Sequence, residues 1–254
     1  MNFTYARSAL LVGLIYAAGV TTCHSAVVSF SAIDSGWYSR YQFFPFVVEH
    51  SPNNVNYAAG EISRLSIRNF FVFDLSGLQV LDGQSVAAAS LVLDTHLVGT
   101  RDVVETVEFF DVTSPIDNVI NRVSAAIAVS TFNDLGTGVS YGTQLYSPSD
   151  SFTQKAIPLN SSAVENIRSA AGSRFAIGGA LTTPSSDRLD NTELIFGDSG
   201  VGSSTIRLDL LIVPEPSTFA VAVSSVLALS LIRRRRPLKS CDAHGRQVSR
   251  VVRA

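Results

Sequence analysis

Hydrophobic and polar residues along the middle of the chain follow the short periods that are typical of β-strands. The clearest case is the segment 205–213, in which Ile206, Leu208 and Leu210 share one face. A strand with one face in a core and the other in water gives this alternation. Further short apolar runs, each bounded by turn-forming residues, predict strands at 27–33, 68–74, 88–94, 105–111, 152–157, 174–181 and 193–196.

Two segments of the same region carry helix signals instead. Ser162 and Glu165 have the spacing of a capping box, and Gly172 follows at a distance suited to ending a helix. Pro115 suits the first turn of a second helix because a proline there loses no intrahelical hydrogen bond. We therefore expect helices at about 162–171 and 115–125. Many short strands with two short helices predict a mainly β fold, a single antiparallel β-sandwich of jelly-roll type.

The first 26 residues have the pattern of a secretory signal peptide. Arg7 precedes an apolar stretch at 9–20, and small residues follow up to Ala26. We expect a signal helix that is removed by cleavage between Ala26 and Val27. The alternative is a lipoprotein signal with lipid attachment at Cys23, although Thr22 stands where a smaller residue is expected.

The other end of the chain has three adjacent parts. Pro214-Glu215-Pro216 is followed by an uncharged apolar run at 219–232 and then by Arg233, Arg234, Arg235 and Arg236. As a helix this run is about 21 Å long, which is short of the ~30 Å hydrocarbon core of a bilayer. The arginines hold their end in the cytoplasm by the positive-inside rule. We expect a transmembrane helix at about 218–232, with residues 27–212, the body of the protein, outside the membrane. The alternative to a specialised C-terminal signal is an ordinary membrane anchor that follows a proline-rich linker.

Charge is distributed unevenly along the 254 residues. The segment 27–213 holds 10 basic and 19 acidic residues, whereas eight basic residues and the single Asp242 lie from position 233 onward. An acidic body argues against a nucleic-acid partner, because phosphate binding needs clustered Lys and Arg. Both cysteines, Cys23 and Cys241, lie outside the body, so we expect neither a disulfide nor thiol chemistry in it.

The C-terminal segment resembles the PEP-CTERM sorting signal of Gram-negative bacteria. Pro214, Glu215 and Pro216 match its motif, and Arg233–Arg236 match its basic stop, although the 18 residues 237–254 continue beyond the usual end. The resemblance implies that an exosortase, a membrane protease, cuts at the motif and releases the body. The body is similar to a domain common among PEP-CTERM proteins, through the segments Arg68–Leu78, Ala89–Thr95, Phe109–Asp117, Phe132–Gly142 and Phe175–Thr183.

The most tempting catalytic motif is Gly197-Asp198-Ser199-Gly200. This order surrounds the nucleophile of trypsin-like proteases, which also need a histidine base. Only His50 and His96 lie between the two ends, and neither has the sequence setting of that family. A hairpin turn between 193–196 and 205–213 is the favoured interpretation, because these are preferred turn residues.

Other chemistry has weaker support in the sequence. Asp187, Asp190 and Asp198 could bind Ca²⁺, but their spacing matches no calcium loop, so solvated turns are favoured. Glu105 and Glu108 cannot be placed as the facing carboxylates of a glycosidase. Trp37 and Tyr38 could stack on a sugar, but core packing is favoured for them, and the same caution applies to Tyr41, Phe43, Phe44 and Phe46.

These observations predict four parts: a signal peptide at 1–26, a β-sandwich outer domain at 27–212, a sorting segment at 213–236 and a basic disordered tail at 237–254. We expect a non-enzymatic protein of the cell envelope or extracellular matrix, without cofactor or metal. Its expected partners are signal peptidase, the inner membrane and an exosortase-type protease. The alternative is a carbohydrate-binding module in an exopolysaccharide matrix; a hydrolase is less favoured because no complete site can be named.

Overall fold

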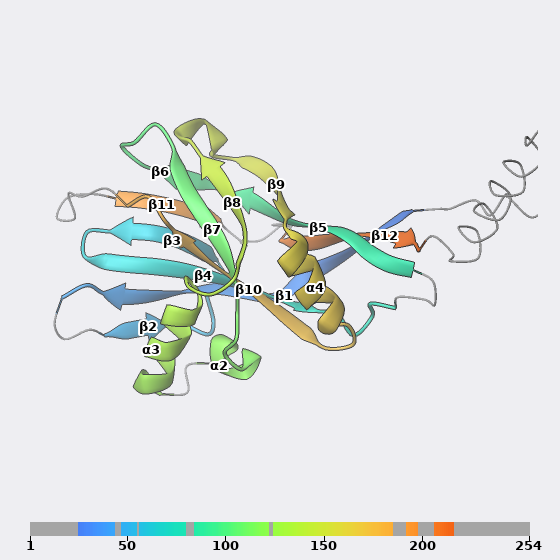
Figure 1. Cartoon of the computed structure of the whole chain (residues 1–254). Coiled ribbons are helices and arrows are strands. Elements are labelled where there is room, and N and C mark those ends of the chain that lie inside the picture. The colour runs from blue at the N-terminus through green and yellow to red at the C-terminus, as the bar shows by residue number, and fades with distance from the viewer. Residues whose placement is uncertain are drawn as a thin grey trace, which may run out of the picture. The chain divides into compact units, whose positions relative to one another are not determined.

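The computed structural model describes residues 25–43, 47–54, 56–79, 84–121, 124–184, 192–197 and 206–215. This part of the chain is mainly β (Figure 1). Its strands are β1 (Ala26–Tyr41), β2 (Val48–His50), β3 (Tyr57–Ile62), β4 (Leu65–Asp74), β5 (Gln84–Thr95), β6 (Leu97–Gly99), β7 (Glu105–Asp111), β8 (Ser140–Tyr146), β9 (Thr153–Leu159), β10 (Arg174–Leu181), β11 (Thr192–Gly197) and β12 (Arg207–Pro214). The helices are α2 (Ile116–Ile120), α3 (Ala125–Asp134) and α4 (Ser161–Ser169), with a short 3-10 turn, η1 (Pro148–Asp150).

The long strand β1 connects two groups of antiparallel strands. Its first half pairs with β12, from Ala26 opposite Ile212 to Ser31 opposite Arg207. From Ala32 onward it pairs with β4, with an irregularity between Ala32 and Asp34. β12 continues to β5 and β9, whereas β4 continues to β3, β11 and β6 and also to β10, β7 and β8. The result is a β-sandwich-like arrangement in which the first and last described strands lie side by side.

The stretch Phe70–Phe73 of β4 is covered on both faces, which explains why it is continuously apolar rather than alternating. Phe71 and Phe73 belong to the main core, together with residues of β5, β7, β12 and α4. Phe70 and Val72 point to the opposite face, where they pack with residues of β2, α2 and α3. All four side chains are fully buried. Figure 1 shows α2 and α3 together on this second side, whereas α4 lies beside β5.

The position of α3 is fixed by contacts at both of its ends. The Ser124 hydroxyl accepts the N–H of Ile127, which caps the first turn. At the other end, Nη1 of Arg68 on β4 donates to the carbonyl oxygens of Phe132 and Asn133, at 2.8 and 2.9 Å. The guanidinium also lies 4.5 Å from the centre of the Phe132 ring. A cation at the negative end of a helix is favourable, so β4 anchors the helix that covers it.

Each of the strand segments predicted from the sequence overlaps an observed strand, although β12 begins only at Arg207 and β9 only at Thr153. Ile206, Leu208 and Leu210 are all buried. The expectation of two helices was wrong, because α3 is a third. Its β-branched residues weaken the helical signal, and the caps supplied by Ser124 and Arg68 compensate. The predicted helix start at Ser162 was also displaced: Asn160 caps α4 by accepting the N–H of Ala163.

The expected hairpin between 193–196 and 205–213 is not present. β11 pairs with β3 and β6, whereas β12 pairs with β1 and β5. The two strands therefore belong to different parts of the sandwich, and the residues between them connect those parts. Turn-forming residues identify a reversal of the chain but not the strand with which the next segment pairs.

The last strand includes the first residue of the Pro214-Glu215-Pro216 motif. Pro214 is the final residue of β12 and lies opposite Gln84 of β5. Pro214 has no N–H to donate, but a proline is tolerated at a strand end, where one ladder hydrogen bond is lost. Pro216, the arginines 233–236, the expected helix at 218–232, the tail and the signal segment 1–24 lie outside the described residues. Within the described part, no helix has the length and hydrophobicity needed to cross a membrane.

Candidate functional site

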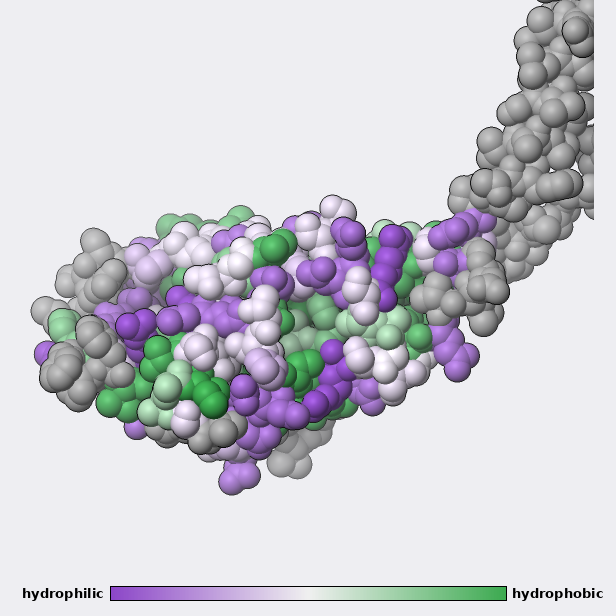
Figure 2. Space-filling model, turned by 60° about the horizontal axis from the view of Figure 1, so that its bottom comes forward, coloured by the Kyte–Doolittle hydropathy of each residue, from purple (hydrophilic) through white to green (hydrophobic). Residues whose placement is uncertain are grey.

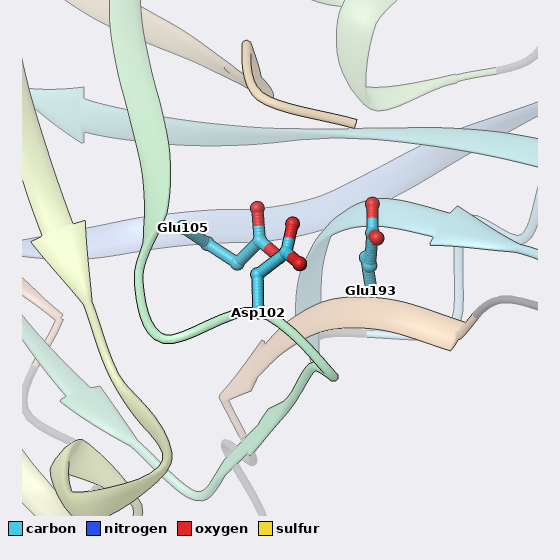
Figure 3. A group of neighbouring side chains, drawn as sticks. All are labelled: Asp102, Glu105 and Glu193. Atoms are coloured by element: carbon cyan, nitrogen blue, oxygen red, sulfur yellow. The ribbon is translucent and has the colours of Figure 1, made fainter. Parts of the chain in front are cut away.

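Three carboxylate groups meet near the start of β7, two from one short segment and the third from a distant strand. Asp102 lies in the loop between β6 and β7, Glu105 is the first residue of β7, and Glu193 lies on β11. One oxygen from each group lies within 4.8 Å of the others. Figure 3 shows Asp102 and Glu105 side by side, with Glu193 next to them. We call these three residues the acidic cluster.

The cluster is only partly open to water. Glu105 and Glu193 are buried, whereas Asp102 is exposed. The Thr100 hydroxyl donates a hydrogen bond to Oε1 of Glu105, and the Thr183 hydroxyl donates to Oε2 at 2.9 Å. The N–H of Asp102 in turn donates to the Thr100 hydroxyl, at 2.9 Å. Two threonines therefore hold the central carboxylate in a fixed orientation.

Burial and like charges act together on the central carboxylate. Burial raises the pKa of Glu105 above its ordinary value, and the negative charges of Glu193 and Asp102 raise it further. The hydrogen bonds from Thr100 and Thr183 act in the opposite direction, because they stabilise the ionised form. The net effect is a raised pKa, so the folded protein binds a proton at Glu105 more strongly than the unfolded chain does.

The acidic cluster can relieve its charge repulsion in two ways. A proton shared among the carboxylates removes one negative charge. A divalent cation such as Ca²⁺ takes six to eight oxygen ligands at about 2.3–2.6 Å, so the oxygens around it lie within about 5 Å of one another. The separation of 4.8 Å or less meets this condition. The three carboxylates and the two threonine hydroxyls are the groups that could supply the ligands.

Replacing Glu105 with glutamine is expected to reduce the pH dependence of stability. A raised pKa in the folded state makes its contribution to stability largest below the unfolded value, and this contribution is lost as the pH rises through the folded value. Glu105→Gln removes that loss and should raise stability near pH 7 by about 0.5–1 kcal/mol. Urea unfolding between pH 4 and 8, with EDTA present to exclude cations, measures the effect.

Glu108 provides the matched control for this experiment. It lies on the same strand but on its opposite face, paired with Ala180 of β10 and Thr143 of β8. Glu108→Gln should leave the pH profile unchanged. Identical profiles for wild type and Glu105→Gln would show that the cluster carries no significant repulsion.

The other candidates from the sequence are not brought together. Glu105 and Glu108 point to opposite faces of β7, so they are not the facing carboxylates of a glycosidase. Both ring nitrogens of His50 contact backbone carbonyl oxygens, of Trp37 and Ile120, at 2.9 and 3.0 Å. The His96 ring contacts Phe152 and Phe196. Asp187, Asp190, Asp198 and Ser199 lie outside the described residues.

Gly197, the first residue of the protease-like motif, has a structural reason to be glycine. It ends β11 opposite Tyr57, and a Cβ at this position would overlap the Tyr57 ring. The Tyr57 hydroxyl donates to the carbonyl oxygen of Asp94 at 2.8 Å, so the ring has little freedom to move aside. The glycine is therefore required by packing between β3 and β11.

Aromatic residues divide between core and surface. Tyr38 is fully buried, as expected, whereas Trp37 is only partly buried. Phe152 is 77% exposed, and its backbone φ of 61° is unusual for a bulky residue. On the face shown in Figure 2, hydrophobic residues form small groups separated by hydrophilic ones.

Sequence reasoning named Glu105 but missed Asp102 and Glu193 as its neighbours. The three residues belong to a loop and two strands that β-pairing brings together over a long distance along the chain. Asp102 is close to Glu105 in the sequence, but a single sequence does not fix which strands pair, so no local pattern could have identified Glu193 as the third member. A clue is the unusual polar start of β7, where Glu105 occupies a core-facing position.

No family model matches the chain. No curated protein matches it either.

Proposed function

We propose that this protein is an exported component of a bacterial cell envelope or extracellular matrix, sorted through its C-terminal segment. In this proposal residues 1–26 direct export and are removed by signal peptidase. The segment 213–236 then holds the body at the inner membrane until an exosortase-type protease acts at Pro214-Glu215-Pro216. The body serves as a structural or interaction domain and carries out no catalysis.

The observation that supports this proposal best is where the described fold begins and ends. β1 starts at Ala26, directly at the expected signal cleavage site, and β12 ends at Pro214, the first residue of the sorting motif. These strands pair with each other, with Ala26 opposite Ile212. Both processing sites are therefore next to one end of the sandwich, where cutting either one removes no internal strand.

The architecture is consistent with an extracellular interaction domain. We propose that the strands form a jelly-roll-like sandwich, a fold that recurs in secreted binding and structural proteins. The described part of the body contains no cysteine, and its core rests on aromatic and aliphatic packing. Such a domain folds without disulfide formation after export.

Mass spectrometry of the mature protein tests the proposal directly. We expect the protein released from cells to begin at Val27 and to lack Arg233–Arg236. A mature form with a lipidated Cys23, or one that retains the arginines, would contradict the proposed processing. Separation of inner-membrane, envelope and extracellular fractions gives the destination in the same experiment.

A carbohydrate-binding module is the second candidate, and one observation favours it. Phe152 presents an exposed aromatic ring, and the ring of His96 lies 4.9 Å away in an edge-to-face arrangement. Aromatic faces at protein surfaces stack on the apolar faces of sugar rings through the same contacts that join aromatic side chains. Phe152 is therefore the residue most suited to contact a polysaccharide chain.

Phe152→Ala is expected to weaken binding to exopolysaccharide by roughly fivefold to tenfold, which corresponds to the loss of one exposed aromatic contact. Stability should not fall, because the side chain is exposed and the positive φ disfavours a bulky residue. Sedimentation with purified exopolysaccharide measures the effect. Leu145→Ala, at another exposed apolar position, is the control, and equal binding by wild type and both variants would remove this candidate.

A further inference from the structure

The last carbonyl groups of α2 are held by two side chains from the sheet. The Tyr38 hydroxyl lies 3.0 Å from the carbonyl oxygen of Asn118 and 2.9 Å from that of Val119. Nε2 of His50 lies 3.0 Å from the carbonyl oxygen of Ile120. The final carbonyls of a helix have no partner within the helix, so these contacts satisfy groups that would otherwise be exposed to a core. Side chains from β1 and β2 therefore cap the C-terminal end of α2.

The partners of His50 determine which form of its ring fits this position. Nδ1 lies 2.9 Å from the carbonyl oxygen of Trp37, so both ring nitrogens face oxygens that only accept hydrogen bonds. A neutral imidazole has one N–H and can donate to one of them, which leaves a lone pair facing the other. The imidazolium has two N–H groups and donates to both.

The surroundings of the ring prevent water from replacing a missing bond. His50 is 7% exposed, and its ring stacks on Tyr38 with the centres 4.4 Å apart. The Phe70 ring of β4 contacts it edge-on, with the centres 5.4 Å apart. A carbonyl that loses its donor here remains buried, which is costly. We propose that His50 is a proton-operated latch, whose charged form holds α2 against β1 and β2 and whose neutral form loosens this attachment.

One acidic side chain interacts with the ring of His50. Asp34 on β1 interacts electrostatically with His50 and accepts the N–H of Ser35 at 2.8 Å. Burial raises the pKa of Asp34, while the positive charge of His50 acts to lower it. β4 contributes the uncharged Phe70 and the charged Arg68, whose guanidinium donates to the carbonyl oxygens of Phe132 and Asn133. The remaining charged residues on β1, β2, α2 and α3 near this position are exposed or bonded elsewhere: Arg40, Glu49, Asp117 and Asp134.

The direction of the pH effect follows from these contacts. Only the protonated ring donates to both carbonyl oxygens, so acid favours the closed latch and alkali loosens it. Val119 is fully buried and packs with Tyr38, Val48 and Phe70 in the second core cluster. Loosening α2 therefore exposes this cluster, while the main core on the other face of β4 stays closed.

Hydrogen exchange in the full-length protein, held in mild detergent, tests the latch. After correction for the intrinsic effect of pH, amides of 116–121 should open roughly tenfold more often at pH 8 than at pH 5.5, in line with a charged histidine at a helix end. Amides of β10 should show no such change. His50→Gln has one donor group and one acceptor at all pH values, so it should abolish the difference, whereas the control His96→Gln should retain it.

Two further measurements test the proposed role of His50 even if the His50→Gln variant does not fold. Nitrogen-15 NMR of the wild-type ring should show both nitrogens protonated at pH 5.5, and a single N–H at that pH would overturn the proposal. Asp34→Asn should reduce the pH response but not remove it, since both carbonyl contacts remain. An equal response in wild type and His50→Gln would also overturn it.

Discussion

Replacing Pro214, Glu215 and Pro216 with alanine should leave an uncut precursor in the inner membrane and abolish release of the body. The sorting protease must recognise the motif itself, so its removal is expected to give an all-or-none effect rather than a slower reaction. The body should still fold, because Pro214 occupies only the final position of β12, opposite Gln84. An alanine there even restores a backbone donor at the strand end. Cell fractionation and mass determination measure the outcome.

The arginine cluster and a distant proline supply the comparison for this experiment. Changing Arg233–Arg236 to serine should let the tail pass through the membrane, because the charges that stop translocation are gone. Pro237→Ala replaces a proline that lies beyond the arginines, and release should remain at the wild-type level. Equal release of the alanine variant and the wild type would show that the C-terminal segment is a plain single-pass anchor.

Gly60→Ala is expected to destabilise the fold by roughly 3–5 kcal/mol, the sum of backbone strain and overpacking. Gly60 lies on β3 with a φ of 144°, a conformation that residues with a side chain rarely adopt. A Cβ at this position would also overlap the carbonyl oxygen of Glu193 on β11. Since β3 and β11 pair directly, the strands would have to separate at this point, and the acidic cluster would be disturbed with them.

Substitutions at two other glycines distinguish the effect of backbone strain from that of overpacking. Gly172 has a φ of 80° but no atom within 4 Å of a Cβ, so Gly172→Ala carries the backbone strain alone. We expect it to cost about 1–2 kcal/mol. At Gly77 the nearest atom, of the Phe30 ring, would lie 4.0 Å from a Cβ, and Gly77→Ala should be nearly neutral. Urea unfolding of the three variants gives the order, and equal losses at Gly60 and Gly172 would show that close packing of β3 on β11 is unimportant.

The parts of the fold that follow local rules could be predicted from the sequence. Alternation located β12, and the bounds of β7 and β10 agree with the expected segments. The second half of β1 was missed because Gly36 and polar residues interrupt the apolar pattern there. β3 was missed because its Ala58, Ala59 and Gly60 are small, so its burial depends on the large Tyr57 and Phe71 rings nearby.

The candidate site depended on information that a single sequence does not contain. Glu105 and Glu108 look equivalent in the sequence, yet β-geometry places them on opposite faces and leaves only the former beside Glu193. Likewise, His50 was considered as a catalytic base because histidine chemistry suggested it. Its two carbonyl partners are set by the packing of β2 against β1 and α2, and these contacts involve residues that lie far from it in the sequence.

The pairing of β1 with β12 also determines when the body can finish folding. Of the described strands β1 is synthesised first and β12 last, so the ladder from Ala26 to Ser31 cannot close until β12 has been made. Contacts between residues this far apart in the sequence slow folding, because the entropy lost in closing the loop must be overcome before the contacts form. During that time residues Ala26–Ser31 have no strand to pair with. A chain that ends before Arg207 leaves them in that state permanently, so premature termination should yield an aggregation-prone product rather than a smaller working domain.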